Sequence, residues 1–530
     1  MLRVSQVKQS IEEAIDLLPR HICKKLRIRE DDLIRFSIYR ESIDARRRPI
    51  QFSYVVDCEV KAEAQILKRK LADVQKIQEK GFALPESGDK KLEHRPVVIG
   101  FGPGGMFAAL MLARAGYRPI VLERGQQLEK RIESVRRYWQ GGPLDPAGNV
   151  QFGEGGAGTF SDGKLTTRSK DPRCHQVLKE LVHFGAPKEI VYQAHPHIGT
   201  DILVNVVKAL REEVIALGGE IHFESEVKDF HIENGKLKAL LVNEQRLACE
   251  QAILAIGHSA RDTMHCLYGH HLHMQAKAFA VGVRVEHPQS MIDDALYGCY
   301  AGHPRLGAAS YRMTCRARNG RGVYTFCMCP GGVVVPAASA EGEVVVNGMS
   351  EHARDKENAN SALLVQVTPE DFGNHPLDGI RYQQELEQKA FVLGGSNGCA
   401  PAQYTNDFLR RKPSSEHAGI QPSYARGVTF CDLHTLFDDT INEALEDGLR
   451  HFDQQIPGFS QKGILTAVES RSSAPLRMVR DEQTLMGSIE GIYPCAEGAG
   501  YAGGIVTSAV DGIRCACALI EQFALPKKES

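Results

Sequence analysis

The sequence lacks the features that would mark a membrane protein, a secreted disulfide scaffold or a highly charged nucleic-acid binder. No uninterrupted apolar run of about 18 residues occurs, so no transmembrane helix is expected. The 14 cysteines form no CxxC pair, which favours reduced thiols over a disulfide framework. Lys and Arg number 64 against 66 Asp and Glu, so the net charge of −2 predicts no global attraction to nucleic acid or anionic membranes.

The first 18 residues also lack the apolar core of a signal peptide, because charged residues recur every few positions. We therefore expect a cytoplasmic protein whose partner is a small-molecule substrate, with no membrane contact and without nucleic acid. Glycine is in excess instead. Its 50 residues in 530 exceed the usual share of about 7%, which indicates tight turns and close contacts between backbone and ligand.

Residues 1–92 are predicted to form a small α/β domain. Residues 11–18 have helical spacing, residues 34–38 and 52–56 alternate as strands do, and a mixed-charge helix is expected over 61–80. Residues 1–95 contain 21 Lys and Arg against 16 Asp and Glu, and Arg46, Arg47 and Arg48 are consecutive. Two interpretations of this excess stay open, a basic patch for RNA or an acidic partner and a solvated strand edge.

A glycine-rich turn between an apolar strand and an Ala-rich helix carries the clearest chemical signal. The strand occupies residues 96–99, the helix follows from residue 106, and the turn between them has the spacing GxGxxG. In this context the turn lets a diphosphate approach the backbone, and the helix N-terminus offers free N–H groups to it. The predicted cofactor-binding residues of the turn are Gly100, Gly102, Pro103, Gly104 and Gly105.

An acidic residue ends the next apolar strand, at Glu123, and Arg124 follows it. A carboxylate at this position can accept hydrogen bonds from both ribose hydroxyls and would repel a 2′-phosphate. We therefore assign both residues to the cofactor site, which suits FAD or NAD rather than NADP.

Two later segments favour FAD over NAD. Residues 250–259 form an apolar strand that stops at Gly257, which resembles the strand and glycine that pack beside the cofactor in flavoproteins with two nucleotide-binding domains. Residues 491–505 form a strand, an acid and a second glycine cluster ahead of an apolar helix, as in flavoproteins whose last helix points at the flavin ring. No second GxGxxG with its strand and helix occurs, so NADH or NADPH is considered only as a diffusible electron donor. The residues assigned to the cofactor here are Gly257, Glu497, Gly498, Gly503, Gly504 and Ile505.

Over nearly its whole length the chain resembles a family of uncharacterised bacterial FAD-dependent dehydrogenases, and more distantly flavoproteins of the fumarate reductase and geranylgeranyl reductase type. The motifs include GEGGAGTFSDGKL at 153–165, VGVRVEHP at 281–288, FCMCPGG at 326–332 and ESRSSAPLR at 469–477. The resemblance implies an α/β fold with a Rossmann-like, doubly wound FAD-binding sheet. That domain would comprise residues 93–261 and 466–526, with a mixed α/β cap domain inserted at 262–465.

The segment 153–165 is too glycine-rich for a regular element and is expected to fold over the cofactor. Gly156, Gly158 and Thr159 are assigned to cofactor binding, and Ser161 and Asp162 are expected as polar contributors. A cation near the flavin would stabilise the negative charge of its reduced form.

Three side chains are candidates for catalysis. Lys164 or Arg471 could supply the cation, and Arg471 could instead clamp a substrate carboxylate; plain structural ion pairing is the alternative for both. His258 follows the Gly257 strand end and is a candidate general base. No metal site is expected, because neither Cys327 and Cys329 nor the histidines at 270–273 come with a set of ligands at zinc-like spacing.

The sequence therefore predicts an FAD-dependent oxidoreductase, a dehydrogenase or reductase that passes hydride through bound flavin. The alternatives are an RNA-modifying or non-redox flavoprotein, favoured only by the basic N-terminal region, and a regulatory FAD-binding protein.

Overall fold

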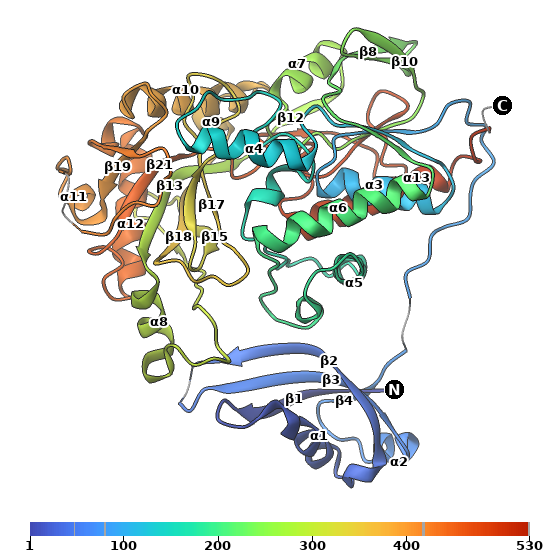
Figure 1. Cartoon of the computed structure of the whole chain (residues 1–530), viewed down its shortest axis with the longest axis vertical. Coiled ribbons are helices and arrows are strands. Elements are labelled where there is room, and N and C mark those ends of the chain that lie inside the picture. Colours follow the sequence, from blue (N-terminus) through green and yellow to red (C-terminus); the bar gives the residue numbers. More distant parts are fainter. Residues whose placement is uncertain (47, 79–80, 416–418, 528–530) are drawn as a thin grey trace.

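The computed structural model describes residues 1–46, 48–78, 81–415 and 419–527 and has three parts (Figure 1). A four-stranded sheet forms the N-terminal part, and the remaining two parts are lobes around a five-stranded parallel sheet and a seven-stranded mixed sheet. This arrangement confirms the predicted α/β fold class. Within the described ranges, no helix is both long enough and apolar enough to cross a membrane.

The N-terminal sheet is antiparallel, with strand order β2-β3-β1-β4, and buries one apolar core. Its elements are β1 (Leu2–Ser10), α1 (Leu18–Leu26), β2 (Leu33–Asp44), β3 (Gln51–Val60), α2 (Glu63–Lys68) and β4 (Val74–Lys76). The predicted strands at 34–38 and 52–56 lie within β2 and β3 and are confirmed.

The predicted boundaries of both helices in this part are wrong, because the structure has helices at Leu18–Leu26 and Glu63–Lys68. The Ile11 backbone N–H donates to the Ile50 carbonyl, so the chain is still paired in the sheet at residue 11, and α1 begins only at Leu18. After α2, Asp73 has a φ of 65° and the chain turns into β4, which pairs with β1. The end of the second predicted helix, residues 79–80, lies outside the described residues.

Ion pairs neutralise part of the basic excess of this region. Arg3 pairs with Asp57, Lys25 with Asp73 and Arg35 with Glu59. Arg46 pairs with its neighbour Asp44, and Arg47 lies outside the described residues.

The parallel-sheet lobe has the strand order β23-β11-β5-β6-β7. Its strands are β5 (Val97–Ile99), β6 (Ile120–Leu122), β7 (Glu220–His222), β11 (Ala252–Leu254) and β23 (Ile492–Pro494). Apolar side chains of four helices share one core with the sheet, α3 (Pro103–Arg114), α5 (Arg173–His183), α6 (Thr200–Ala216) and α13 (Ile505–Ile520). A second core joins the sheet to α7 (Arg261–Gly269) and to the antiparallel strands β8 (Val227–Glu233), β9 (Lys236–Val242) and β10 (Gln245–Ala248).

The mixed-sheet lobe has the strand order β14-β15-β18-β13-β21-β19-β20. Its strands are β13 (Phe279–Pro288), β14 (Thr314–Arg316), β15 (Gly322–Cys329), β18 (Asn358–Val367), β19 (Ala400–Tyr404), β20 (Val428–Phe430) and β21 (Ile464–Glu469). The hairpin of β16 (Val333–Pro336) and β17 (Val346–Met349) adjoins it. Its helices are α8 (Gln289–Tyr297), α9 (Pro369–Phe372), α10 (Asp378–Leu393), α11 (Thr405–Leu409) and α12 (Asp439–Asp453).

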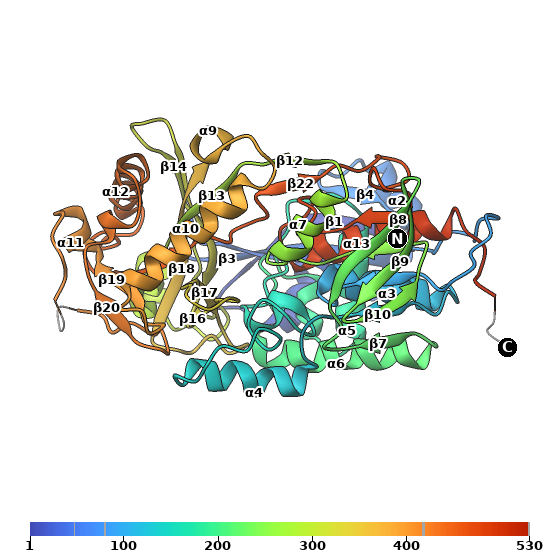
Figure 2. The same cartoon turned by 90° about the horizontal axis from the view of Figure 1, so that it is seen from above.

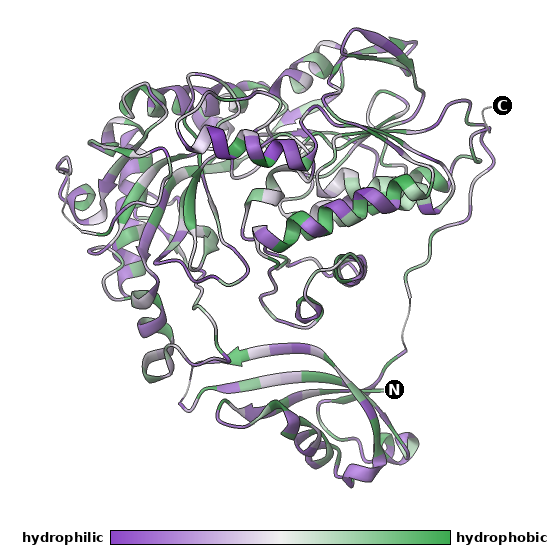
Figure 3. Cartoon of the chain, in the orientation of Figure 1, coloured by the Kyte–Doolittle hydropathy of each residue, from purple (hydrophilic) through white to green (hydrophobic). Residues whose placement is uncertain are grey.

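The chain passes between the two lobes at β12 (Met274–Ala276) and β22 (Leu476–Met478), which pair with each other and lie between the lobes in Figure 2. Strand β21 remains in the mixed sheet as far as Glu469, beyond the boundary expected at residues 465 and 466. Figure 3 shows apolar residues along the central strands of both lobes, whereas α4 (Leu128–Trp139) is largely hydrophilic.

Candidate cofactor and active site

A cavity of about 960 Å³ is lined by residues of both lobes. The turn after β5 and the start of α13 contribute from the parallel-sheet lobe, and Tyr311, Cys327 and Glu469 contribute from the mixed-sheet lobe. Its volume lies in the range of ligand sites, which form preferentially between domains and at the carboxyl ends of parallel strands.

One wall of the cavity is backbone, formed by residues 100–104, 156–158 and 503–505, and is called the backbone wall below. Helix α3 begins after Gly102 and α13 after Gly504, and neither helix has a side-chain cap. The first N–H groups of both helices therefore have no intrahelical partner at the cavity, and both positive dipole ends favour an anion there.

The glycines of the first turn have different roles. A Cβ on Gly102 would lie 3.7 Å from the Gly156 Cα, an ordinary contact, so the protein itself leaves room beside this residue. A Cβ on Gly105 would lie 1.9 Å from the Gly100 carbonyl oxygen, and Gly105 does not line the cavity. Gly105 therefore permits helix α3 to pack against the strand.

The structure brings most of the predicted site residues to this cavity. Those lining it are Gly100, Gly102, Pro103, Gly104, Glu123, Arg124, Gly156, Gly158, Lys164, Gly257, His258, Arg471, Glu497, Gly503, Gly504 and Ile505.

Three predicted residues lie behind the cavity wall. Gly105 is one; the second is Gly498, where a Cβ would lie 2.5 Å from the Gly257 carbonyl oxygen. The third, Thr159, is buried, and its carbonyl accepts a 2.6 Å hydrogen bond from the Thr200 hydroxyl. These residues hold the wall in place, so their assignment to direct cofactor contact is corrected.

The Glu123 carboxylate organises the backbone around it. It accepts hydrogen bonds from the backbone N–H groups of Phe101, Gly125 and Gly153 at 2.8–3.0 Å, and it lines the cavity. Each carboxylate oxygen has capacity for further donors, so these bonds orient Glu123 without saturating it. Arg124 pairs with Glu226 and Asp262, which fixes its guanidinium at the wall.

The segment preceding and including residue 156 is held by an arginine that sequence reasoning missed. Arg131, on α4, is fully buried and donates to the carbonyls of Asn149, Val150, Glu154 and Gly156 at 2.6–3.0 Å. Burial lowers the pKa of its guanidinium to about 10. Nothing in the charged stretch around residue 131 distinguishes this arginine from its exposed neighbours, because its partners are backbone atoms.

Asp162 and Lys164, expected at the cofactor, have separate roles. Asp162 is fully buried and accepts a 2.9 Å hydrogen bond from Arg354 of the other lobe. It does not line the cavity, so the expectation that it contacts the cofactor is corrected: it joins the two lobes. Lys164 lines the cavity, and among the described residues its ammonium has no ion-pair partner within bonding distance. A free cation is thus available beside the cavity.

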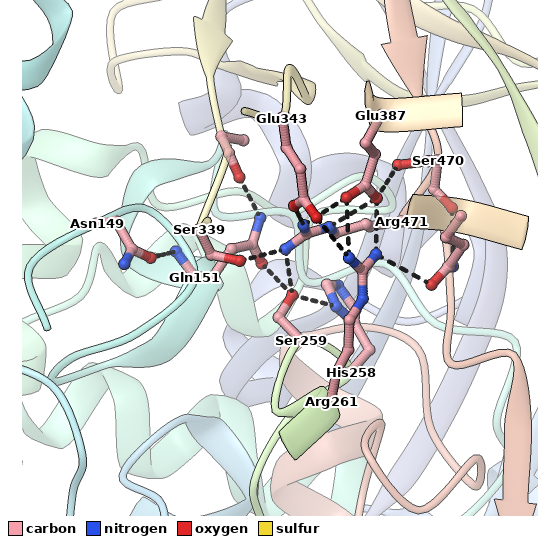
Figure 4. A network of polar contacts seen from close by, with 12 residues as sticks. Asn149, Gln151, His258, Ser259, Arg261, Ser339, Glu343, Glu387, Ser470 and Arg471 are labelled. Atoms are coloured by element: carbon pink, nitrogen blue, oxygen red, sulfur yellow. Dashed lines mark hydrogen bonds and ion pairs between the residues drawn. The ribbon is translucent and has the colours of Figure 1, made fainter. Parts of the chain in front are cut away.

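Arg471 belongs to a buried network shown in Figure 4. Its guanidinium donates to Glu387 at 2.7 and 3.0 Å, to Glu343 at 2.9 Å, and to Ser259 and Ser339 at 3.2 and 2.6 Å. These bonds use all five of its N–H donors. The expectation that Arg471 clamps a substrate carboxylate is therefore wrong, because protein groups occupy the whole fork.

His258 lines the cavity beside this network, and its Nδ1 lies 2.9 Å from the Ser259 hydroxyl. Burial, together with the positive charges of Arg471 and Arg261, lowers the pKa of His258 to about 3. The imidazole is neutral at physiological pH and binds protons too weakly for a general base. The candidate base role is corrected to that of a hydrogen-bonding group.

A second buried pair was not singled out from the sequence. Arg284 is fully buried and donates to both oxygens of Glu469 at 3.1 Å. Burial raises the pKa of Glu469 to about 7, although Arg284 opposes the shift. Glu469 lines the cavity, so it can bind or release a proton there near neutral pH. Arg284 lies in the motif at 281–288 and Glu469 in the motif at 469–477, and these two motifs are the sequence features that could have indicated the pair.

Among the residues that the structure describes, two side-chain groups away from the cavity have metal-ligating chemistry. They are Asp229, Cys266 and His270, and Cys495, Asp511 and Cys515. In the first, Asp229 accepts hydrogen bonds from His270 and Cys266, and in the second, Asp511 pairs with Arg480 at 2.7 Å. These interactions account for both groups without an ion.

The residues at the cavity fit a flavin dinucleotide. Two uncapped helix N-termini suit the diphosphate and the electron-rich end of the ring, and a Cβ on Gly257 or Gly503 would meet no protein atom within 4 Å. The oriented Glu123 and the free Lys164 ammonium complete a donor and acceptor set suited to ribose and reduced flavin.

The chain was compared with family models and with solved structures. Residues 278–472 match the family "FAD-dependent protein, C-terminal domain-like", and residues 1–59 match a domain of unknown function (DUF8436). Among solved structures, glycine oxidase from Bacillus cereus is 11% identical and covers 81% of this chain and 98% of its own, with a TM-score of 0.34. L-Proline dehydrogenase from P. horikoshii is 12% identical and covers 81% and 93%, with a TM-score of 0.33.

A curated protein of Clostridium beijerinckii, described as uncharacterized, is 48% identical over 538 residues, which cover 99% of this chain and 100% of that protein. The chain therefore belongs to the same family as this Clostridium protein.

Proposed function

We propose that the chain is an FAD-dependent oxidoreductase, a dehydrogenase or reductase that passes a hydride through flavin bound in the cavity. The observation that carries the proposal is the opening of two uncapped helix N-termini, of α3 and α13, onto one cavity. The match of residues 278–472 to an FAD-dependent domain family supports the same cofactor.

In this proposal the residues that line the cavity bind different parts of FAD. Glu123 accepts hydrogen bonds from the ribose, and the turn at Gly100–Gly104 with the α3 N-terminus holds the diphosphate. The α13 N-terminus and Lys164 stabilise negative charge at the ring. When bound, FAD supplies a two-electron acceptor and donor.

Glu469 is the proton carrier in this proposal. Its pKa of about 7 and its place on the cavity wall let it hold or release a proton, while Arg284 fixes its orientation. His258 stays neutral and orients a reactant by hydrogen bonding.

The substrate class we propose is a small organic anion. Arg168 and Arg312 line the cavity and are exposed, and within the described part of the chain neither guanidinium has an ion pair. Unpaired cations at a cavity mouth attract negatively charged ligands. Faster reduction of the bound flavin by carboxylates or phosphates than by their neutral analogues would support this class, and the reverse order would oppose it.

The test is the visible spectrum of the purified protein and of two matched glycine variants. Gly102→Asp should abolish flavin binding, because the carboxylate would occupy the diphosphate position while the fold has room for it. Gly81→Asp adds the same charge away from the cavity, where no atom lies within 4 Å, and should retain flavin. Normal flavin content in folded Gly102→Asp would contradict the cofactor assignment.

Anaerobic additions to the flavin-loaded protein then address turnover. Rapid bleaching by NADH or NADPH would identify a nicotinamide as the diffusible donor. Bleaching only by an organic anion would identify a dehydrogenase acting on its own substrate. A protein whose flavin no donor reduces would contradict the oxidoreductase proposal.

A further inference from the structure

Strand β15 ends in a β-bulge at Cys327-Met328-Cys329. Its pairing with β18 is regular up to Phe326 opposite Ala362 and then skips to Cys329 opposite Asn360. Cys327 lies in this bulge with a φ of 44°, a conformation that is uncommon for residues other than glycine. Such strained positions concentrate at functional sites.

The bulge brings the two thiols together at the cavity. All 14 cysteines lie within the described residues, and among them Cys327 alone lines the cavity. The Cys329 Sγ lies 3.2 Å from the Cys327 carbonyl oxygen, and the two thiols are hydrogen-bonded to each other. Cys327 therefore lines the proposed cofactor site, and Cys329 lies beside it outside the cavity lining.

The surroundings of the pair favour one thiol and one thiolate. The hydrogen bond from Cys327 and the positive charge of Arg284, whose Nη2 lies 3.7 Å from the sulfur, lower the pKa of Cys329 to about 6. The same hydrogen bond, with burial, raises the pKa of Cys327 well above its usual value. A low-pKa thiol with a second cysteine beside it is the usual arrangement of a reversible redox pair.

The other close pair of thiols differs in its position. Cys495 and Cys515 are also hydrogen-bonded, but they lie beside the Arg480–Asp511 ion pair and neither lines the cavity. Only the 327 and 329 pair combines contact with the cavity, a strained bulge and an adjacent guanidinium.

We propose that Cys327 and Cys329 form a reversible disulfide that exchanges electrons with flavin in the cavity, as a second two-electron centre of this protein. The inference rests on the proposed function. In the oxidation, an S–S bond forms between the Cys329 thiolate and Cys327 while the Cys327 S–H bond breaks. The electron pair and that proton pass together to the oxidised flavin, so charge and hydrogen balance, and reduction of the disulfide is the reverse step.

The first test does not depend on flavin. The protein is equilibrated with mixtures of reduced and oxidised glutathione, quenched with acid, alkylated and mapped by peptide mass spectrometry. The peptide containing residues 327 and 329 should convert to a form lacking two hydrogens and carrying no alkyl group. Cys327→Ser and Cys329→Ser should abolish that form, whereas Cys299→Ser, which removes an exposed thiol away from the cavity, should retain it.

The second test counts electrons in the flavin-loaded protein. Anaerobic titration with dithionite should consume twice the reducing equivalents per flavin in the wild type that it consumes in Cys327→Ser or Cys329→Ser. Equal consumption, or a 327–329 peptide that is alkylated at every glutathione ratio, overturns the inference and leaves the proposed function intact. Failure of the wild type to bind flavin overturns the proposed function, and with it the exchange of electrons with flavin.

Discussion

The cavity has two walls that are built in different ways. The backbone wall presents N–H groups and glycines from residues 100–104, 156–158 and 503–505. The other wall is built from charged side chains and is called the charged wall. It consists of Glu469 and Arg471 with their buried partners Arg284, Glu343 and Glu387. The first offers free N–H groups and positive helix-dipole ends that favour an anion, and the second supplies groups that hold protons and charge.

This difference determines which kind of substitution reduces stability at each wall. On the backbone wall, a substitution reduces stability when it adds atoms where none fit. The loss of stability depends on which neighbouring atom the new atom contacts. On the charged wall, a substitution reduces stability when it removes one member of an ion pair, because the other member then remains a buried charge without a partner. The three predictions below test this contrast, from the largest expected effect to the smallest.

The largest effect is expected for Glu387→Ala. The Glu387 carboxylate is fully buried and binds Arg471 and Arg261 at 2.7 Å each, so its removal leaves the buried Arg471 and the partly buried Arg261 short of a partner. Breaking a buried pair in this way costs about 3–5 kcal/mol. The free energy of unfolding in urea should fall by that amount.

Two matched variants sharpen this prediction. Glu343→Gln should cost less, because burial and the neighbouring Glu387 raise the pKa of Glu343 to about 7 and leave it partly neutral in the native protein. Glu490→Gln breaks only the exposed pair with Lys236 and should change stability by less than about 1 kcal/mol. Equal costs for Glu387→Ala and Glu490→Gln would show that the network contributes nothing to stability.

An intermediate effect is expected for Gly105→Ala, directly behind the backbone wall. The new Cβ would lie 1.9 Å from the Gly100 carbonyl oxygen, so the strand and helix α3 must separate, at a cost of about 1–3 kcal/mol. Flavin content should fall with stability. Gly102→Asp, by contrast, should lose flavin and keep its urea midpoint, and a large loss of stability there would contradict the division of roles between the two glycines.

The same contrast explains which parts of the site could be predicted from the sequence. The glycine spacing at residues 100–105 is local, and its meaning follows from the strand and helix beside it. The partners of the charged wall are remote in sequence, because Arg284 and Glu469 are 185 positions apart and Glu387 and Arg471 are 84 positions apart. Pairings at such separations depend on the strand order of the mixed sheet, which no local pattern specifies.

Two errors in the sequence-based predictions have the same physical origin. Arg471 was expected to bind substrate, since its motif marks it as important but cannot show that five protein acceptors surround it. Residues 11–18 have helical spacing, yet sheet pairing at Ile11 delays the helix to Leu18. In both cases tertiary contacts decided between local alternatives.

The smallest effect concerns Glu497, which lines the cavity close to the backbone wall and is only partly buried. Burial raises its pKa from 4.5 to about 7, and the nearby Lys277 opposes the shift. Between those values the folded protein binds more protons at this site than the unfolded chain does, so the contribution of Glu497 to stability falls as pH rises from about 4.5 through 7.

Glu497→Gln removes this titration while keeping the size of the side chain. The variant should therefore gain stability relative to wild type as pH rises through this window, by on the order of 1–2 kcal/mol, with no further gain above it. Urea unfolding of both proteins at a series of pH values measures the difference. If the difference between them does not change with pH, Glu497 is ionised throughout this window, and its partial burial on the cavity wall does not raise its pKa.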